Sequence, residues 1–337
     1  MGTGHVMRCL ALAQAWQEIG GRAIFALATK TSALEARLAE ESMEVAHLST
    51  QPGNQKDSEQ TIDLAQREKA LWVVLDGYHF NADYQKPIKQ AGLNLLFIDD
   101  YGHADHYFAD LVLNQNIYAN KSLYRKREPY TELLLGTQYV LLRREFWLWR
   151  GWQRQIPEVA RKVLVTLGGG DPDNVTLKVI RALQQLDVPG LEAKIVVGPV
   201  NVHLETLRKV TQTSTFNMQL LTEVPNMPEL MVWADIAISA GGSTCWELAL
   251  MGLPSVLLVV AENQRRIAKG LDQAGMAINL GWFNRISRIK ISTELVKLLN
   301  ARRRRQQMSQ TGQQSVDGKG AYRVIEALRT SVPVMET

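Results

Sequence analysis

Short apolar runs rich in β-branched residues alternate along the chain with longer stretches in which apolar residues recur every three or four positions. The first pattern is typical of buried strands, and the second is typical of helices that cover a sheet. The expected strands are residues 22–28, 71–76, 94–99, 110–114, 162–167, 193–197, 215–220, 235–239 and 255–259. The expected helices include residues 6–19, 61–69, 174–186, 203–211, 243–251 and 263–274. This alternation predicts the α/β class, with parallel sheets covered on both faces.

The alternation pauses once, over residues 144–161, which read REFWLWRGWQRQIPEVAR. We therefore expect two Rossmann-like, doubly wound lobes that face a cleft, residues 1–146 and 162–330, joined by a linker of residues 147–161. The linker tryptophans are interpreted as packing groups between the lobes rather than as a ligand box: Trp147, Trp149 and Trp152. In doubly wound sheets, ligands bind beyond the carboxyl ends of the strands, so the loops after strands are where chemistry is expected.

Composition excludes several classes of protein. The 337 residues suffice for two domains, and no apolar run is long enough to predict a transmembrane helix. The amino terminus lacks the features of a signal peptide, and only Cys9 and Cys245 occur, far apart, so a cytoplasmic location is expected. A net charge of +4 is too weak to indicate nucleic-acid binding. The basic run Arg302–Arg305 is interpreted as a solvated helix face.

Three glycine-rich loops stand directly before expected helices: Gly2-Thr3-Gly4-His5, Leu167-Gly168-Gly169-Gly170-Asp171 and Ser239-Ala240-Gly241-Gly242-Ser243-Thr244. Glycine lets a ligand approach the backbone, and the helix start that follows offers N–H groups and a partial positive charge. Each loop alone is as readily a tight turn, but three of them together indicate a diphosphate site that needs no metal. No dinucleotide fingerprint or P-loop motif occurs.

Two residues next to these loops carry candidate chemistry. Glu247 lies one helical turn after Ser243, where a carboxylate can bind both hydroxyls of a ribose; the alternative is a carboxylate favoured there by the helix dipole alone. His5 lies at the start of a helix, which disfavours the imidazolium and suits a general base; the alternative is a capping or packed histidine.

Weaker candidates are given structural interpretations. Asp171 or Asp173 is expected to cap a helix rather than bind a metal. Tyr78, after a strand that ends at Asp76, either bonds a substrate or packs. Cys9 and Cys245 are expected to be small buried fillers. A set of acids and histidines in one loop matches no familiar ligand spacing and is not assigned a metal: Asp99, Asp100, His103, Asp105 and His106.

The motifs, taken in order, resemble one family, the UDP-2,4-diacetamido-2,4,6-trideoxy-β-L-altropyranose hydrolases of bacterial pseudaminic acid biosynthesis. The stretches that carry the resemblance span residues 2–328: GTGHVMRCLALA, VVLDGYHF, FIDDYGHADHYFADLVLNQN, LLLGTQYVLLRREF, VLVTLGGGDPDN, SAGGSTCWELALMGLPSVLLVVAENQRRIAKGL and DGKGAYRVIEAL. The resemblance implies a glycosyltransferase B type fold related to MurG. It implies hydrolysis of the glycosyl C1–O bond of a UDP-sugar, without a cofactor or metal.

The resemblance also implies roles for particular residues. His5 falls on the base that activates water, and Glu247 on the ribose ligand. Residues 241–244 fall on the diphosphate loop, with Asn263 and Gln264 near the sugar. The implied substrate-binding residues are Gly4, Arg8, Tyr78, Arg143, Gly169, Asn174, Gly241, Gly242, Ser243, Thr244, Glu247, Asn263 and Gln264. Attack by water on the face opposite UDP predicts inversion at C1.

In that family a strand precedes the G-x-G-H loop, and here none is present, so we expect the first strand of the N-terminal lobe to be missing. A truncated or misassigned start would make this form unstable or weakly active. Two other functions remain open: a UDP-sugar-dependent glycosyltransferase and a non-catalytic nucleotide-sugar binding protein. Neither the sugar stereochemistry nor the oligomeric state follows from the sequence.

Overall fold

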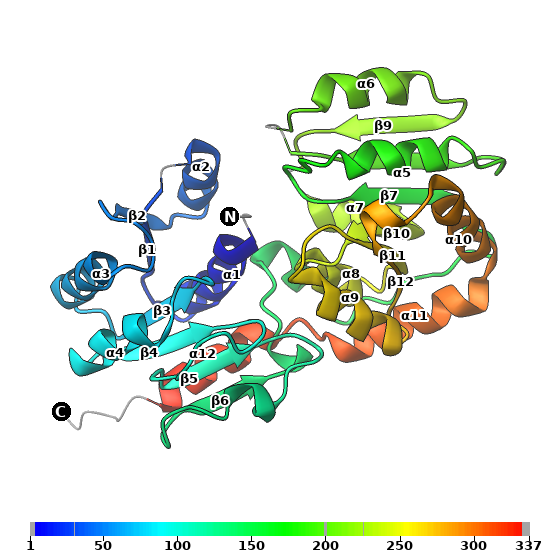
Figure 1. Ribbon diagram of the computed structural model, residues 1–337. Helices are drawn as coiled ribbons and strands as arrows, with labels where there is room; N and C mark the ends of the chain where they lie inside the picture. The colour runs from blue at the N-terminus through cyan, green and yellow to red at the C-terminus, as the bar shows by residue number, and fades with distance from the viewer. Residues whose placement is uncertain (1–3, 30, 199–200, 225, 332–337) are drawn as a thin grey trace. The chain divides into compact units, whose positions relative to one another are not determined.

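The computed structural model describes residues 4–29, 31–198, 201–224 and 226–331. Gly2 and Thr3 of the first glycine loop lie outside these ranges. The chain divides into two compact units (Figure 1), unit 1 of Met1–Arg144 with Gly318–Thr337 and unit 2 of Glu145–Asp317. Within the described ranges, none of the helices has the length and apolar character needed to cross a membrane.

Unit 2 contains a six-stranded parallel sheet of the doubly wound kind. Its strands are β7 (Lys162–Thr166), β8 (Glu192–Val196), β9 (Asn217–Leu221), β10 (Ile236–Ala240), β11 (Ser255–Val259) and β12 (Ala277–Trp282). Their order is β12-β11-β10-β7-β8-β9. The chain runs outward from β7 to β9 and then returns to β10 beside β7, so the switch point lies between β7 and β10.

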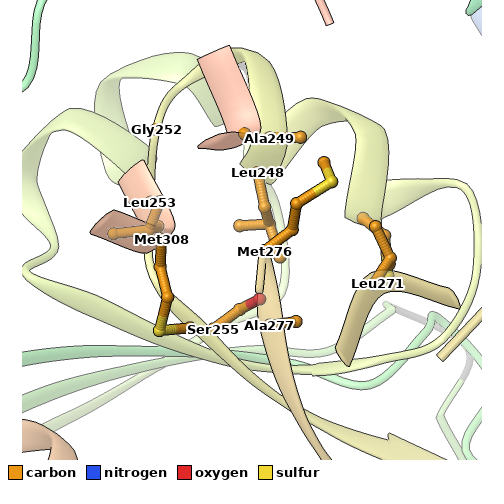
Figure 2. A pocket seen from close by; sticks show the side chains of 11 residues that line it. Leu248, Ala249, Gly252, Leu253, Ser255, Leu271, Met276, Ala277 and Met308 are labelled. Atoms are coloured by element: carbon orange, nitrogen blue, oxygen red, sulfur yellow. The ribbon is translucent and has the colours of Figure 1, made fainter. Parts of the chain in front are cut away.

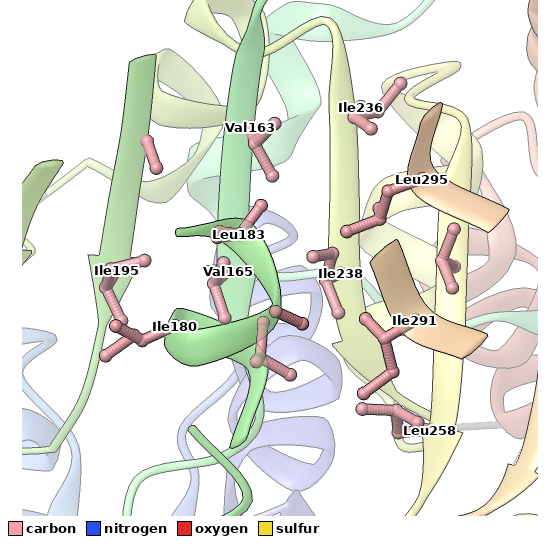
Figure 3. Packing of buried hydrophobic residues seen from close by; sticks show 14 of the residues in the cluster. Val163, Val165, Ile180, Leu183, Ile195, Ile236, Ile238, Leu258, Ile291 and Leu295 are labelled. Atoms are coloured by element: carbon pink, nitrogen blue, oxygen red, sulfur yellow. The ribbon is translucent and has the colours of Figure 1, made fainter. Parts of the chain in front are cut away.

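Helices cover this sheet because its strands are apolar on both faces. Val163 and Val165 of β7 and Ile238 of β10 point toward helices α5 (Val175–Leu183) and α10 (Arg288–Asn300), as Figure 3 shows. The other helices of the unit are α6 (Leu204–Gln212), α7 (Met227–Trp233), α8 (Thr244–Leu250), α9 (Gln264–Gln273) and α11 (Arg302–Ser315). This continuous apolar core fixes the loops that follow the strands.

Unit 1 contains two separate parallel sheets. One consists of β1 (Ile24–Leu27) and β2 (Glu44–His47), and the other has the order β3-β4-β5-β6. The four strands of the second sheet are β3 (Trp72–Asp76), β4 (Asn94–Ile98), β5 (Leu111–Asn114) and β6 (Glu132–Leu135). The α-helices of unit 1 are α1 (Gly4–Glu18), α2 (Ser32–Glu40), α3 (Gln55–Arg67), α4 (Ala82–Gln90) and α12 (Gly320–Thr330). Among the described residues, no strand joins β1 to β3 by hydrogen bonds.

Helix α12 belongs to unit 1, whereas the sequence placed residues 162–330 in the second lobe. Its buried face packs in unit 1 beside α1 through Ala321, Val324, Ile325 and Leu328. Its start lies very close to the chain after β6, since a Cβ on Gly320 would lie 2.2 Å from the carbonyl oxygen of Val140. The pattern predicts the helix but not the sheet that it covers.

The predicted linker, residues 147–161, also needs correction, because it is part of unit 2. Arg154 donates hydrogen bonds to the carbonyl oxygens of Met231 at 2.6 Å and Ala234 at 2.6 Å. Arg305 donates to the carbonyl oxygen of Glu158 at 2.9 Å and is fully buried. The prediction of a solvated face is therefore wrong for Arg305, which anchors this segment to α11.

Candidate functional site

Polar side chains gather in unit 1 where three adjacent strands end. Asp76 is the last residue of β3, Asp100 follows β4, and Asn116 follows β5. Parallel pairing brings these ends to one edge of the sheet, since Asp76 is in register with Ile98 of β4. Helix α1 begins at Gly4 beside this edge, and its first turn contributes His5.

His5 contacts a carboxylate through one ring nitrogen. Its Nδ1 lies 2.6 Å from Oδ1 of Asp76, whose side chain is 2% exposed, whereas the His5 side chain is 18% exposed. The Tyr78 ring packs against the imidazole in a T-shaped arrangement, with 4.9 Å between the ring centroids. The imidazole is thus held on one side by Asp76 and is partly exposed to solvent.

Arg8 joins the two carboxylates of this edge. Its Nε donates to Oδ2 of Asp76 at 2.5 Å, and its Nη1 donates to Oδ1 of Asp100 at 2.7 Å. Burial opposes the charge of Arg8, but the two carboxylates raise its pKa well above the usual value. Arg8 as a whole is only 8% exposed. The structure thus gives Arg8 an internal ionic role, while its predicted contact with substrate stays a prediction.

Asp100 is held by several donors. Its carboxylate accepts from the Tyr78 hydroxyl at 2.7 Å and from Nδ2 of Asn116 at 3.0 Å, in addition to Arg8. Burial alone would raise the pKa of Asp100, but the charge of Arg8 and these hydrogen bonds lower it to about 2. Tyr78 therefore links the Asp100 carboxylate to the His5 ring.

This depressed pKa predicts a steep loss of stability in acid. Because Asp100 titrates at about 2 when folded and at 3.8 in its ordinary state, its contribution is complete above pH 3.8 and disappears as the pH falls toward 2. The linkage relation converts this shift to about 2 kcal/mol. Urea unfolding should show that the wild type loses about this much more free energy of unfolding than Asp100→Asn on acidification. Parallel acid profiles for the two proteins would contradict it.

Asp99 is fully buried and has a separate role. Its carboxylate accepts from the backbone N–H groups of Asp100 and Gly102, from Nδ1 of His103 at 2.9 Å and from the Tyr107 hydroxyl at 2.9 Å. Burial would raise the pKa of Asp99, but the His103 contact and the other donors lower it. Asp99 therefore folds the loop of residues 99–107 and places Asp100 beside Arg8.

The remaining predicted residues of unit 1 lie around α1. Arg143 Nη1 lies 4.0 Å from the sulfur of Met7, on the same helix as His5. Cys9 is close to the Asp76 carboxylate, with its Sγ 3.6 Å from Oδ2. Burial first, and then the charge of Asp76, raise the pKa of the Cys9 thiol well above its usual value, which disfavours the thiolate that a nucleophile requires.

Three of the loops of unit 2 follow neighbouring strands at the switch point. Ser239 of β10 is in register with Thr166 of β7, and Ala240 is in register with Leu258 of β11. The loops after β7, β10 and β11 therefore start at one edge of the sheet. These loops contain Gly169, Asn174, Gly241, Gly242, Ser243 and Asn263.

The loop after β10 lies directly against the start of α9. A Cβ on Gly241 would lie 3.1 Å from the carbonyl oxygen of Gln264 and 3.3 Å from Cβ of Ala268. The Gln264 side chain accepts from the backbone N–H of Val260 at 3.0 Å, which fixes the turn that precedes Asn263. The structure thus brings Gly241 and Gln264 together, and only a glycine fits the contact without a shift of α9.

Helix α8 starts immediately after this loop. Ser243 is its N-cap residue and makes no capping hydrogen bond with its side chain, Thr244 is its first residue, and Glu247 lies in its first turn. Cys245 is buried, and burial together with the Glu247 carboxylate raises the pKa of its thiol to about 12. The prediction that Cys245 is a buried filler fits this environment.

The loop after β7 has a different construction. The N-cap residue of α5 is Asn174, so the predicted N-cap position is wrong, but the Asp171 carboxylate caps the helix by accepting from the backbone N–H groups of Val175 at 2.9 Å and Thr176 at 2.8 Å. Because this carboxylate occupies two amides at the start of α5, they are not available to a diphosphate. Gly169 accepts from the backbone N–H of Gly198 at 3.1 Å, and Asn174 has a positive φ of 50°.

Neither of two hollows in the structure is lined by a predicted site residue. One, of about 10 Å³, lies among apolar side chains such as Leu248, Met276 and Met308 (Figure 2). It can hold at most one water molecule. The other, of about 330 Å³, lies in unit 1 beside Trp72 and Trp16, at the amino end of β3 and away from Asp76. Within the described ranges, no group of three or more His, Cys, Asp or Glu side chains has a metal-binding arrangement.

Comparison with known families places a recognisable domain in the second half of the chain. Residues 163–324 match the model of the glycosyltransferase family 28 C-terminal domain. This match begins in β7, includes the whole sheet of unit 2 and extends into α12. It covers slightly less than half of the chain.

Three curated proteins show similarity over longer stretches. The chain is 26% identical to the spore coat polysaccharide biosynthesis protein SpsG of Bacillus subtilis, over 97% of this chain and 94% of SpsG. It is 26% identical to an uncharacterised protein of Methanocaldococcus jannaschii, over 79% of this chain but only 54% of that protein, so it spans about half of that relative. It is 28% identical to a Helicobacter pylori protein named pseudaminic acid cytidylyltransferase and UDP-2,4-diacetamido-2,4,6-trideoxy-beta-L-altropyranose hydrolase, over 61% of this chain and 37% of that protein.

Solved structures show the same fold. The crystal structure of Acinetobacter baumannii MurG is similar with a TM-score of 0.70 and 18% sequence identity, covering 98% of this chain and 97% of MurG. The fold prediction of two Rossmann-like lobes of the glycosyltransferase B type is therefore confirmed.

Proposed function

We propose that the protein hydrolyses the glycosyl C1–O bond of a UDP-diacetamido-trideoxy sugar, as in pseudaminic acid biosynthesis. The oxygen of a water molecule attacks C1, and its proton passes to the His5 imidazole. The bond from C1 to the β-phosphate oxygen breaks, and its electron pair leaves with UDP. The products are UDP and the free 2,4-diacetamido-2,4,6-trideoxy-L-altrose, with inverted configuration at C1.

The observation that carries this proposal is the partly exposed His5 imidazole at the carboxyl edge of the sheet, with Nδ1 engaged by Asp76. A base held in this way can contribute about 10²–10⁴-fold to the rate. The similarity to the Helicobacter pylori protein supports the choice of hydrolysis, although the chain covers only 37% of that protein.

We assign UDP binding to unit 2. Residues 241–244 lie at the switch point of the sheet, where nucleotides bind in doubly wound folds. Backbone N–H groups at the start of α8 neutralise the diphosphate, and Glu247 in its first turn binds the ribose hydroxyls. Asn263 and Gln264 approach the sugar. Neutralising the charge of UDP makes it a good leaving group without a metal.

A panel of UDP-sugars assayed for UDP release, without an acceptor, tests the proposal. We expect release from the 2,4-diacetamido-2,4,6-trideoxy sugar, little from UDP-N-acetylglucosamine, and the same rate with and without a chelator. NMR of the freshly released sugar should show inversion at C1. Chelator sensitivity would contradict the metal-free chemistry, and retention would contradict direct attack by water.

A glycosyltransferase is the second candidate, because the matched domain and the MurG likeness belong to glycosyl-transferring proteins. The same assay separates the two. A transferase would release UDP slowly until an acceptor is added, whereas a hydrolase needs none. UDP binding with no turnover of any sugar would instead favour a non-catalytic binding protein.

A further inference from the structure

We propose that Asp76, held by Arg8, is a positioning residue that keeps a proton on Nδ1 of His5 and leaves Nε2 as the nitrogen that accepts a proton. This inference rests on the proposed function, since it concerns how the same base works. Its central contact, however, is a property of the resting protein and can be tested without a substrate.

The contacts of Nδ1 determine which nitrogen carries the proton. Nδ1 of His5 lies 2.6 Å from Oδ1 of Asp76 and 3.3 Å from Nη2 of Arg8. A carboxylate oxygen only accepts hydrogen bonds and a guanidinium nitrogen only donates them, so the two contacts require opposite states of Nδ1. The shorter contact, to a charged acceptor, is the stronger one. Nδ1 therefore donates to Asp76, and the lone pair lies on Nε2.

Nε2 is available to act as a base. Within the part of the chain that the structure describes, the side-chain hydrogen bonds of His5 are made through Nδ1 and none through Nε2, and the His5 side chain is 18% exposed. A carboxylate on the far side of the ring also stabilises the imidazolium that forms when Nε2 takes a proton. The arrangement thus favours both the correct tautomer and the charged product of proton transfer.

Arg8 fixes the carboxylate itself. Its Nε and Nη2 contact the two oxygens of Asp76 at 2.5 and 2.6 Å, a bidentate geometry that allows one orientation of the carboxylate. The remaining guanidinium nitrogen is tied to Asp100 at 2.7 Å. Arg8 therefore fixes the orientation of the Asp76 carboxylate, and Oδ1 of Asp76 faces His5 rather than solvent.

The first test is imidazole NMR of the full chain labelled with ¹⁵N-histidine. At alkaline pH, where imidazoles are neutral, we expect the His5 signals of the wild type to report the Nδ1–H tautomer. The His5 signals are identified by their loss in His5→Gln. In Asp76→Asn we expect the two tautomers to mix. A wild-type spectrum with the proton on Nε2 would overturn the proposal. His5→Gln serves only to assign the His5 signals, and the tautomer itself is read from the wild type.

The second test is kinetic. Asp76→Asn should lower kcat for UDP release by about 10²–10⁴-fold with KM changed less than about threefold, because the variant loses proton transfer rather than substrate contacts. Asp110→Asn is the matched control: Asp110 is an ion-paired carboxylate of the same unit, 2.6 Å from Lys89, at the amino end of β5. We expect its kcat to stay within about twofold of the wild type.

The outcomes separate the two proposals. If no UDP-sugar is hydrolysed but the wild type shows the Nδ1–H tautomer and Asp76→Asn loses it, the positioning role stands and the proposed function fails. If the wild type hydrolyses UDP-sugars and Asp76→Asn does so equally fast, the function stands and the positioning role is refuted. A KM increase with unchanged kcat would refute it as well.

Discussion

Replacing His5 with glutamine is expected to lower the rate of UDP release about 10²–10⁴-fold. Glutamine can still donate a hydrogen bond to Asp76 but cannot accept a proton from water. UDP binding, which we assign to unit 2, should be unchanged when it is measured by calorimetry. No larger effect on activity is expected, because the proposed reaction has one proton acceptor and His5 is that group.

His47→Gln serves as the matched control. His47 is also a histidine of unit 1, but it lies in β2 with a side chain 37% exposed, 3.6 Å from Glu35. Its replacement should leave UDP release unchanged. Equal rates of UDP release by His5→Gln and the wild type would show that His5 is not the base.

The largest expected effect on stability is that of Asp99→Asn. The substitution keeps the shape of the side chain but removes the charge that faces His103 and places an amide NH₂ among donors. Breaking a buried ion pair from one side costs about 3–5 kcal/mol. We expect a loss of this size in the free energy of unfolding measured by urea at about pH 6, with reduced UDP release because the 99–107 loop also carries Asp100.

The pH dependence of this variant follows from two shifts of opposite sign. Burial would lower the pKa of His103, but its contact with Asp99 raises it. The contribution of His103 to the free energy of unfolding is therefore complete below the ordinary pKa of 6.5 and is lost as the pH rises through the pKa in the folded protein. The lowered pKa of Asp99 makes its own contribution disappear in acid. The stability difference between wild type and variant should therefore be greatest between about pH 4 and 6.5.

Asp105→Asn controls for charge in the same loop, because Asp105 is exposed. Its free energy of unfolding should stay within about 0.5 kcal/mol of the wild type. If Asp99→Asn is equally mild at every pH, the loop does not depend on the buried carboxylate, and another group must place Asp100 beside Arg8.

Much of the fold could be predicted because the apolar runs are distinct. All nine expected strands are present within a few residues. The three strands that sequence reasoning missed are β2, β6 and β12. Two of them have only four residues, and β12 contains a glycine and an asparagine. Which sheet a helix covers depends on long-range packing that local periodicity does not encode, and α12 was therefore placed in the wrong lobe.

The candidate site was predicted in part. Sequence reasoning named His5 and Tyr78, but Asp76 only as a strand end, and it did not name Asn116. It placed Asp99 and Asp100 in one possible ligand set, whereas in the structure Asp99 contacts His103 and Asp100 contacts Arg8. Side chains of adjacent residues in an extended chain point in opposite directions, so neighbours in sequence seldom share a ligand. The sequence signal available for this site was a polar residue at or just after the end of three consecutive strands, β3, β4 and β5.

The position of α12 has a consequence for how the chain acquires its structure. Unit 2 is one uninterrupted segment, Glu145–Asp317, whereas unit 1 is assembled from both ends of the chain. As the polypeptide emerges from the ribosome, unit 2 can fold as soon as its own residues have emerged. The surface of unit 1 against which α12 packs therefore stays uncovered until α12, which follows unit 2 in the chain, has been made.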